Sequence, residues 1–308
     1  MSRILVIGSS NTDMVIRVPA LPRPGETVLG GEFTINGGGK GANQALAAAR
    51  AGGAVTFLGR VGDDDFGRRA LADLGAAGID TSPCIVDAGS PSGVAQILVD
   101  DHGENCIAVA PGANARLARA DLAAAGPHFQ PGHLVLVQLE TPLATVEAAL
   151  QQAREAGCRT VLNPAPAQPL PAALLTLVDL LTPNESEAEH LTGIAVSDDA
   201  SAAAAAEALH AQGVTTVLLT RGARGVFLST AGADGGQRAF PAFRVTAVDS
   251  TAAGDVFNGC LVAALSEGVD LAAAIPFAQA GAALSVQLPG AQSSVPERAA
   301  IDAFLGTG

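Results

Sequence analysis

The feature that most limits the fold of this chain is a regular alternation of short apolar runs with amphipathic segments. Apolar runs such as LVLVQLE and VTTVLLT alternate with segments whose apolar residues recur every three or four positions, such as PLATVEAALQQAREAG. Short apolar runs are typical of buried strands, and the longer spacing is typical of helices. Repeated strand–helix units predict an α/β fold of the Rossmann type, with a mostly parallel central sheet flanked by helices.

Two further pairs of segments have a different pattern. MVIRV and TVLGGEFTI are separated by the turn-rich PALPRPGE, and VAQILVD and NCIAVA are separated by residues 101–104. Alternating segments joined by turns predict hairpins rather than strand–helix units. We therefore expect a small antiparallel sheet, called the lid below, built from about 12–36 and 92–110 within one α/β domain spanning 1–308. A lid over a site and a dimer contact are two uses for such a sheet, and its unpaired edges favour a homodimer.

Composition excludes several classes of partner. The formal net charge is −13 over 308 residues, and no run of Lys or Arg interrupts it. Such a chain is poorly suited to bind nucleic acid or an anionic membrane. The N-terminal apolar run is too short for a signal peptide or a membrane span, and the uncharged stretch 271–296 is expected to form a buried helix and a loop. The four cysteines and five histidines lack metal-ligand spacing, so we expect reduced thiols in a cytoplasmic protein.

The stretch Asp249–Gly259, DSTAAGDVFNG, contains the main candidate for catalysis. FRVTAV before it alternates like a strand, and VFNGCLVAALSEG after it has helical spacing. Ala252, Ala253 and Gly254 are expected to form a tight turn whose bare N–H groups make an anion site at a helix N-terminus. Asp255 then stands in the first helical turn. It either complements the helix dipole or acts as the base of a phosphoryl-transfer enzyme.

A glycine-rich string, NGGGKGAN, covers residues 36–43 and leads into the helical QALAAARAGG. It is not a dinucleotide fingerprint, because no buried strand precedes it, and Gly41 stands where a Walker A loop needs Ser or Thr. Lys40 and Asn43 lie one helical turn apart and share a face. They either bind vicinal hydroxyls of a polyol or simply form the first turn of a capped helix.

Several polar residues follow predicted strands, where open parallel sheets bind ligands. Asn11 and Asp13 follow the first strand and are candidates for substrate contacts or for an Asx turn. Asn184 and Glu187 fit either a capping box or a water-mediated Mg²⁺ site. Glu140 ends another strand. A glycine turn follows a further strand and either covers a nucleotide or joins a hairpin; it consists of Thr220, Arg221, Gly222, Ala223, Arg224 and Gly225.

Taken together, these motifs resemble those of the ribokinases, within the wider PfkB-type family of carbohydrate kinases. The resemblance runs from GSSNTD to SVPERAAIDAFL and rests on NGGGKGANQA, DSTAAGDVFNG, NPAPA and TPNESEAE. It implies a ribokinase-like fold and ATP-dependent phosphorylation of the 5-hydroxyl of D-ribose to D-ribose 5-phosphate. It also implies Asp255 as general base and the backbone N–H groups of 252–254 as the anion hole. Sugar contacts would come from Asn11, Asp13, Gly39, Lys40, Asn43, Glu140 and Asp255.

The same resemblance implies ATP, Mg²⁺ and a monovalent cation, K⁺. The nucleotide would be bordered by Asn184, the turn 220–225, Gly254, Asp255 and Gln279, and Mg²⁺ would be organised through water by Asn184 and Glu187. Gln279 stands where ribokinases carry His, which affects the adenine contact rather than the chemistry. The monovalent cation would lie among Asp249, Thr251, Ser285, Leu288, Gly290 and Ser294, largely on carbonyl oxygens.

Two other functions compete with this interpretation. A related kinase would phosphorylate deoxyribose, a nucleoside or another sugar, although a nucleoside needs apolar cover and the lid segments contain only Phe33 as an aromatic residue. A non-catalytic sugar-binding protein on the same fold is the second alternative. The presence of Gly254 and Asp255 argues against it.

Overall fold

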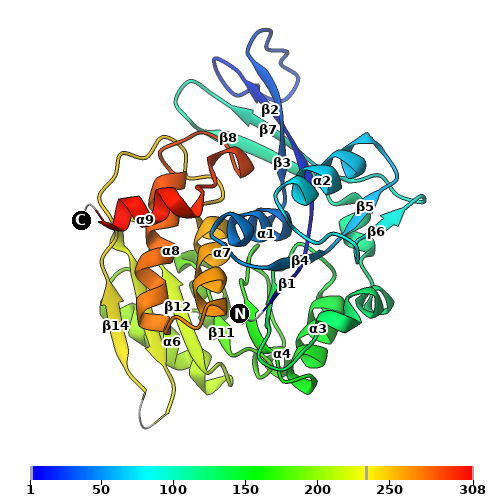
Figure 1. Cartoon of the computed structure of the whole chain (residues 1–308). Helices are drawn as coiled ribbons and strands as arrows, with labels where there is room; N and C mark the ends of the chain where they lie inside the picture. The colour runs from blue at the N-terminus through cyan, green and yellow to red at the C-terminus, as the bar shows by residue number, and fades with distance from the viewer. Residues whose placement is uncertain (1–2, 233–234, 307–308) are drawn as a thin grey trace.

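The computed structural model describes residues 3–232 and 235–306, and it has the predicted α/β architecture (Figure 1). Its main sheet has eight strands in the order β14-β13-β12-β11-β10-β9-β1-β4. Neighbours from β12 to β4 are parallel, whereas β13 and β14 are antiparallel at one edge. The strands are β1 (Ile4–Ile7), β4 (Val55–Leu58), β9 (Leu134–Val137), β10 (Arg159–Leu162), β11 (Leu180–Leu181), β12 (Thr216–Thr220), β13 (Val226–Thr230) and β14 (Gln237–Phe240).

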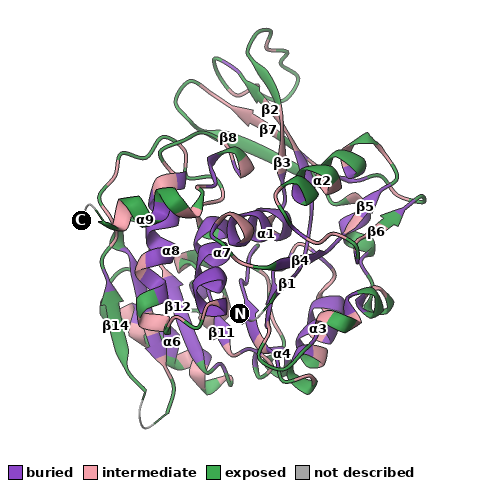
Figure 2. Ribbon diagram, viewed as in Figure 1, coloured by how far each residue is buried: buried purple, intermediate pink, exposed green. Residues whose placement is uncertain are grey.

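The central strands are apolar throughout because helices cover both faces of the sheet. In β1, Ile4 and Val6 pack on one face, and Leu5 and Ile7 pack on the other. The first face is covered by α1 (Lys40–Arg50), α7 (Ala253–Ser266), α8 (Leu271–Ser285) and α9 (Arg298–Gly306). The second is covered by α3 (Leu143–Glu155), α4 (Ala172–Leu175), α5 (Glu185–Thr192) and α6 (Asp199–Ala211). Figure 2 shows these strands and the inner sides of the helices as buried.

Outside these layers, α2 (Asp65–Ala76) contacts β5 (Arg60–Gly62), which pairs with β6 (Ile85–Asp87). Short 3-10 helices connect other elements: η1 (Gly112–Arg116), η2 (Arg119–His128), η3 (Gly222–Arg224) and η4 (Gln292–Ser294). The expected buried helix over 271–296 is confirmed as α8, followed by a loop and η4. Among the described residues, no helix is long and apolar enough to cross a membrane.

The lid is a separate four-stranded sheet in the order β3-β2-β7-β8. Its strands are β2 (Asn11–Arg17), β3 (Phe33–Gly38), β7 (Gly93–Val99) and β8 (Asn105–Ala110), and they extend beyond the main body in Figure 1. The outer pairs are antiparallel, as predicted, and the inner pair β2–β7 is parallel. The two discontinuous parts of the chain therefore meet side by side in the lid.

One predicted strand is wrong. Residues 243–248, FRVTAV, form no strand, although their side chains alternate in polarity. This segment leaves the sheet edge after β14 and runs toward α7, and the Val248 N–H donates to Val286 O rather than to a neighbouring strand. Without a ladder partner, alternation alone does not make a strand.

The helices that carry the candidate site, α1 and α7, are in close contact. A Cβ atom at Gly259 of α7 would lie 2.6 Å from Gln44 O and would also meet Ala47 Cβ of α1. Glycine at 259 and alanine at 47 thus let the two helix backbones approach closely. This approach brings Asn43 and Gln44 next to Asp255.

This close approach makes Gly259→Ala destabilising, although alanine is the better helix former. The added methyl group has no space, so we expect the free energy of unfolding to fall by ~1–3 kcal/mol. Gly75→Ala is the matched control, because Gly75 also lies in a helix and an added Cβ there meets nothing within 4 Å. The control is expected to stabilise by about 0.5–1 kcal/mol in urea unfolding. Equal effects of the two changes would contradict the packing argument.

Candidate active site

Asp255 lies in the first turn of α7 and is buried, with 5% of its surface exposed. Its Oδ2 accepts a hydrogen bond from Asn43 Nδ2 at 3.0 Å, and its Oδ1 accepts one from Gln44 Nε2 at 2.9 Å. Complementing the helix dipole does not require a carboxylate to be buried. Asp255 is instead fixed between two helices, as a catalytic group requires.

The turn before Asp255 is strained in a way that exposes backbone donors. Ala252 has φ 58°, which makes it the one non-glycine residue with positive φ in the described chain. The N–H of Ala253 donates to Ser250 O at 3.2 Å, so it is already occupied. The N–H groups of Ala252 and Gly254 donate to no described residue, and a Cβ at Gly254 would meet nothing within 4 Å. Two of the three predicted donors are therefore available to an anion.

Three further carboxylates, those of Asp13, Glu140 and Glu187, lie near Asp255. Burial, with smaller contributions from Glu140 and Asp255, raises the pKa of Asp13 to about 6. Burial also raises the pKa of Asp255 and of Glu187, with Lys40 acting against burial at both groups. Burial lowers the pKa of Lys40, but Asp255, Glu140 and Glu187 outweigh that effect and raise it above its usual value. Lys40 is thus a charged ammonium group that makes no direct ion pair with any described residue.

The predicted sugar-binding residues lie together on the lid side of Asp255. The Asp13 carboxylate packs against Gly38, where any Cβ would collide with it. Glu140 Oε2 accepts hydrogen bonds from Ser9 Oγ and from Lys40 N, which ties the end of β9 to the start of α1. Gly39 has φ 86°, and a Cβ there would lie 2.7 Å from Asn11 N. The glycines therefore let the loop at 36–40 approach Asn11 and Asp13.

Asn43 and Asn11 have different hydrogen-bonding states. Asn43 Oδ1 is buried and has no partner, so it is free to accept from a hydroxyl. Asn11 Oδ1 accepts from Asn114 Nδ2 at 2.8 Å, and Asn114 is itself held by the backbone of Ser10. Sequence reasoning missed Asn114, because nothing near η1 marks it as part of a site.

A cavity of about 330 Å³ lies on the other side of the turn at Gly254. Part of the predicted nucleotide-binding set lines it, namely Thr220, Gly222, Ala223, Gly225, Gly254 and Gln279. Apolar side chains, including Phe243 and Val245, cover the rest. Gln279 Nε2 donates to Phe240 O and Pro241 O, which fixes the segment that forms one wall. The turn 220–225 is both a hairpin connection between β12 and β13 and a wall of this cavity.

Four residues of the predicted nucleotide-binding set do not line the cavity, namely Asn184, Arg221, Arg224 and Asp255. Arg221 is buried, pairs with Asp199 of α6 and lies 5.6 Å from the centre of the Phe227 ring. Arg224 pairs with Glu185 and donates to Ser197 O. Their side chains hold the turn against α5 and α6, so neither reaches a ligand in the cavity.

Asn184 and Glu187 form the capping box that was one of the two interpretations. Asn184 Oδ1 accepts from Glu187 N at 2.8 Å, and Glu187 Oε2 accepts from Asn184 N at 2.8 Å. Asn184 also lies beside Thr220, which lines the cavity. Glu187 interacts electrostatically with Lys40 and Asp255. Capping and a place beside the site are therefore compatible.

The residues predicted to surround a monovalent cation lie on two loops that meet. Asp249 Oδ1 accepts from Thr251 N, and its Oδ2 accepts from Gly290 N, each at 2.8 Å. Burial raises the pKa of Asp249, but these hydrogen bonds outweigh it and hold the pKa below its usual value. Ser285 and Ser294, which flank Gly290 in the sequence, are buried, whereas Leu288 is 53% exposed. Leu288 could therefore contribute only its backbone carbonyl oxygen to a cation site.

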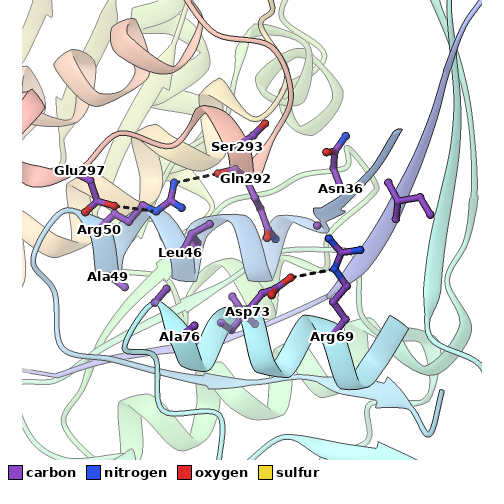
Figure 3. A pocket seen from close by; sticks show the side chains of 14 residues that line it. Asn36, Leu46, Ala49, Arg50, Arg69, Asp73, Ala76, Gln292, Ser293 and Glu297 are labelled. Carbon is purple, nitrogen blue, oxygen red and sulfur yellow. Dashed lines mark hydrogen bonds and ion pairs between the residues drawn. The ribbon is translucent and has the colours of Figure 1, made fainter. Parts of the chain in front are cut away.

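A larger cavity of about 640 Å³ lies between α1, α2 and η4 (Figure 3). It touches Asn36 and Gly37 of the glycine loop but contains neither Asp255 nor Gly254. Its two arginines are already paired, Arg50 with Glu297 and Arg69 with Asp73. The smaller cavity is the better candidate for a phosphate-bearing ligand, because it is lined by Gly254, whose N–H donates to no described residue.

Comparison with known proteins agrees with this geometry. Residues 1–298 match the family model for the pfkB family carbohydrate kinases. The chain is 46% identical to the ribokinase of Haemophilus influenzae over 302 residues, which cover 98% of each chain. It is 37% identical to the deoxyribokinase of Salmonella typhi, again over 98% of each chain.

Solved structures lead to the same family. The ribokinase of Arabidopsis thaliana, in a structure complexed with ribose and ATP, matches with a TM-score of 0.89 and 31% identity over 99% of each chain. Family model, full-length relatives and fold coincide over nearly the whole chain. The chain therefore belongs to the pfkB family of carbohydrate kinases.

Proposed function

We propose that this kinase transfers the γ-phosphate of ATP to the 5-hydroxyl of D-ribose, giving D-ribose 5-phosphate. The observation that carries the proposal is the position of Asp255. Its carboxylate is buried against Asn43, one of the residues predicted to bind the sugar, and it directly follows Gly254, which lines the cavity that we assign to the nucleotide. The relatives named ribokinase support ribose as the substrate.

The mechanism follows from the charges at the site. Asp255 accepts the proton of the sugar hydroxyl as its oxygen attacks the γ-phosphorus in line. The N–H groups of Ala252 and Gly254, at the N-terminus of α7, stabilise the negative charge that spreads over the equatorial oxygens. Lys40 adds a positive charge from the sugar side. The lid excludes water, which would otherwise compete as acceptor.

Mg²⁺ fits the site only through water. Both carboxylate oxygens of Glu187 already accept hydrogen bonds from Asn184, and the described residues contain no cluster of three or more metal-ligating side chains. Mg²⁺ commonly keeps several waters and is bound with substrate phosphates. We propose that Asn184 and Glu187 orient such waters. The ion would supply charge neutralisation at the phosphates.

Deoxyribose is the main alternative acceptor, since the deoxyribokinase relative is also full-length. A nucleoside or another sugar is a further possibility. The cysteines are all free thiols, which suits the cytoplasm that we propose as the compartment.

The test of the function is ADP release with a panel of ribose, deoxyribose, other sugars and nucleosides. We expect turnover on ribose, and Asp255→Asn to lower kcat by at least ~100-fold, because a general base contributes on that scale. Sugar affinity, measured by calorimetry, should stay nearly unchanged. Activity should fall as pH drops through a pKa above the usual aspartate range, since Asp255 must be ionised and burial raises its pKa.

Three outcomes would contradict the proposal. Absence of turnover on ribose, with turnover on another acceptor, would leave a pfkB-family kinase of different specificity. Near-full activity of Asp255→Asn would remove the assigned base. Sugar binding without ATP consumption would favour the non-catalytic sugar-binding alternative.

We further propose that K⁺ activates the enzyme from the loops around Asp249 and Gly290. The support is that the Asp249 carboxylate joins these loops directly beside the turn at Ala252. A cation on their carbonyl oxygens would stabilise that turn. We expect a higher kcat in K⁺ than in Na⁺-only or metal-free Tris buffer, and Asp249→Asn to remove the difference. Equal wild-type rates in the three buffers would exclude the site.

We also propose that the protein forms a homodimer through the lid. Asp13 on β2 lies toward the sugar site, so the alternate residues Met14 and Ile16 lie on the opposite face. There an apolar groove of about 240 Å³ is lined by Met14, Ile16, Phe33, Gln96, Ile97, Leu98, Cys106 and Ala108. Phe33 is 56% exposed, and the outer strand β8 is exposed along its whole length. A second lid would cover this apolar surface.

Light scattering after size exclusion tests the dimer. We expect the wild-type chain to have twice the monomer mass and Ile16→Glu to shift it to a monomer, because a buried charge at the interface is unfavourable. Val86→Glu is the control, since Val86 is also exposed, at 53%, but lies on β6 outside the lid. A monomeric wild-type chain, or a dimer that Ile16→Glu leaves intact, would exclude this interface.

A further inference from the structure

Three polar side chains form a row at the carboxyl ends of neighbouring strands. Gln138, Asn163 and Thr182 directly follow β9, β10 and β11. The strand register pairs Val137 with Leu162 and Leu162 with Leu181, so the next residues of the three strands also lie side by side. Gln138 and Thr182 are each 1% exposed and Asn163 is 6% exposed. Buried amides and hydroxyls need hydrogen-bond partners, and these three side chains share one network in which only Gln138 Oε1 has no partner among the described residues.

Gln44 of α1 is the residue at which this network meets Asp255. It is fully buried, with 0% exposure. One N–H of its amide donates to Asp255 Oδ1 and the other to Asn163 Oδ1, both at 2.9 Å. Its Oε1 accepts from Gln138 Nε2 at 2.6 Å. A rotated Gln44 amide would place its oxygen against two acceptors, so the partners permit one orientation.

The network continues to the turn beside the anion site. Asn163 Nδ2 donates to Thr182 O at 3.0 Å. Thr182 Oγ1 donates to Asn258 Oδ1 at 2.6 Å, and Asn258 Nδ2 donates to Gly254 O at 2.8 Å. The carboxylate and the peptide before it are therefore both held by side chains that rest on the main sheet.

We propose that Gln44 is a positioning residue for the phosphoryl transfer, held by Gln138 and Asn163. It donates to Oδ1 of Asp255, while Oδ2 accepts from Asn43, whose own Oδ1 has no partner. Oδ2, on the side of Asn43, is then the oxygen that receives the proton of the sugar hydroxyl. Gln44 does not touch the sugar in this arrangement and acts through Asp255. The inference rests on the proposed function, in which Asp255 is the general base.

The charges facing Asp255 make the contribution of Gln44 measurable. Glu140 follows β9, Asp13 lies on β2 and Glu187 lies on α5, and all three disfavour a second negative charge. Lys40 from α1 is the cation that favours it. Burial raises the pKa of Asp255, and Lys40, Asn43 and Gln44 act against burial. Removing the hydrogen bond from Gln44 destabilises the ionised form, so the pKa of Asp255 must rise further.

Gln44→Met tests the inference, because methionine keeps the length and removes all three hydrogen bonds. We expect kcat to fall by ~10- to 100-fold, the scale for a misplaced catalytic group, with KM for the sugar within about threefold of wild type. The acidic limb of the kcat–pH profile should move up by about one pH unit, the scale of a hydrogen bond to a charged group. Gln138→Met removes only the partner of Gln44 Oε1, and we expect a smaller shift in the same direction.

Thr145→Val is the matched control for a lost buried hydrogen bond. Thr145 lies in α3, on the other face of the main sheet from α7, and is 3% exposed. Its hydroxyl donates to Leu117 O at 2.8 Å. It should lower the melting temperature without changing the pH profile. If Gln44→Met does not fold, the kcat–pH profile of Gln138→Met becomes the test. A wild-type kcat–pH profile for whichever of the two variants folds would overturn the inference. A change in sugar KM without a change in kcat also overturns it.

Asp255→Asn, assayed in parallel, separates this inference from the function on which it rests. If Asp255→Asn stays active, the assignment of Asp255 as general base fails. If Asp255→Asn is inactive while Gln44→Met has the wild-type kcat and profile, only the positioning role fails.

Discussion

The structure depends on burying one carboxylate without leaving it unpaired. An isolated ionised carboxylate in an apolar interior is strongly unfavourable, so Asp255 needs donors that do not move. Asn43 and Gln44 supply them from consecutive positions of α1, and Lys40 adds a charge from the same helix. This requirement explains why α1 and α7 touch at small residues. A larger residue at Gly259 would separate the helices and leave the carboxylate without partners.

The same site contains an excess of negative charge, because several buried carboxylates lie close together around Asp255. Glu140, Glu187 and Asp255 interact with one lysine, and Asp13 adds a further carboxylate beside Glu140 and Asp255, in a chain of net charge −13. ATP is itself an anion, so its phosphates need compensation from backbone donors and from ions rather than from the protein's net charge. The positive-φ turn at Ala252 provides such donors without adding a side chain. In the proposed reaction, anion binding thus rests on backbone geometry, while proton transfer rests on side-chain carboxylates.

Sequence patterns predicted the layers of the fold because burial on both sides of a parallel sheet leaves an unambiguous apolar signal. They predicted the grouping of Asn11, Asp13, Lys40, Asn43, Glu140 and Asp255 because each of these residues lies in a short local motif, either just after an apolar strand or at the start of a helix. FRVTAV was predicted wrongly because pairing depends on a neighbour that alternation does not specify. The side-chain directions of Arg221 and Arg224 depend on partners in α5 and α6. Asn114 and Gln44 likewise gained their roles only through contacts between distant segments.

Strand β2 of the lid carries both Asp13 and part of the apolar groove. Successive residues of a strand point to opposite faces, so Asp13 and Met14 of β2 lie on different sides of the lid. A shift of one residue in the pairing of β2 would exchange the two faces and remove the carboxylate from the sugar side. The register of β2 with β3 and β7 therefore determines both the face of the lid on which Asp13 lies and the face on which the apolar groove is exposed. Because the loop at Gly38 and Gly39 continues directly from β3 into α1, this register also determines where Lys40 and Asn43 lie relative to Asp255.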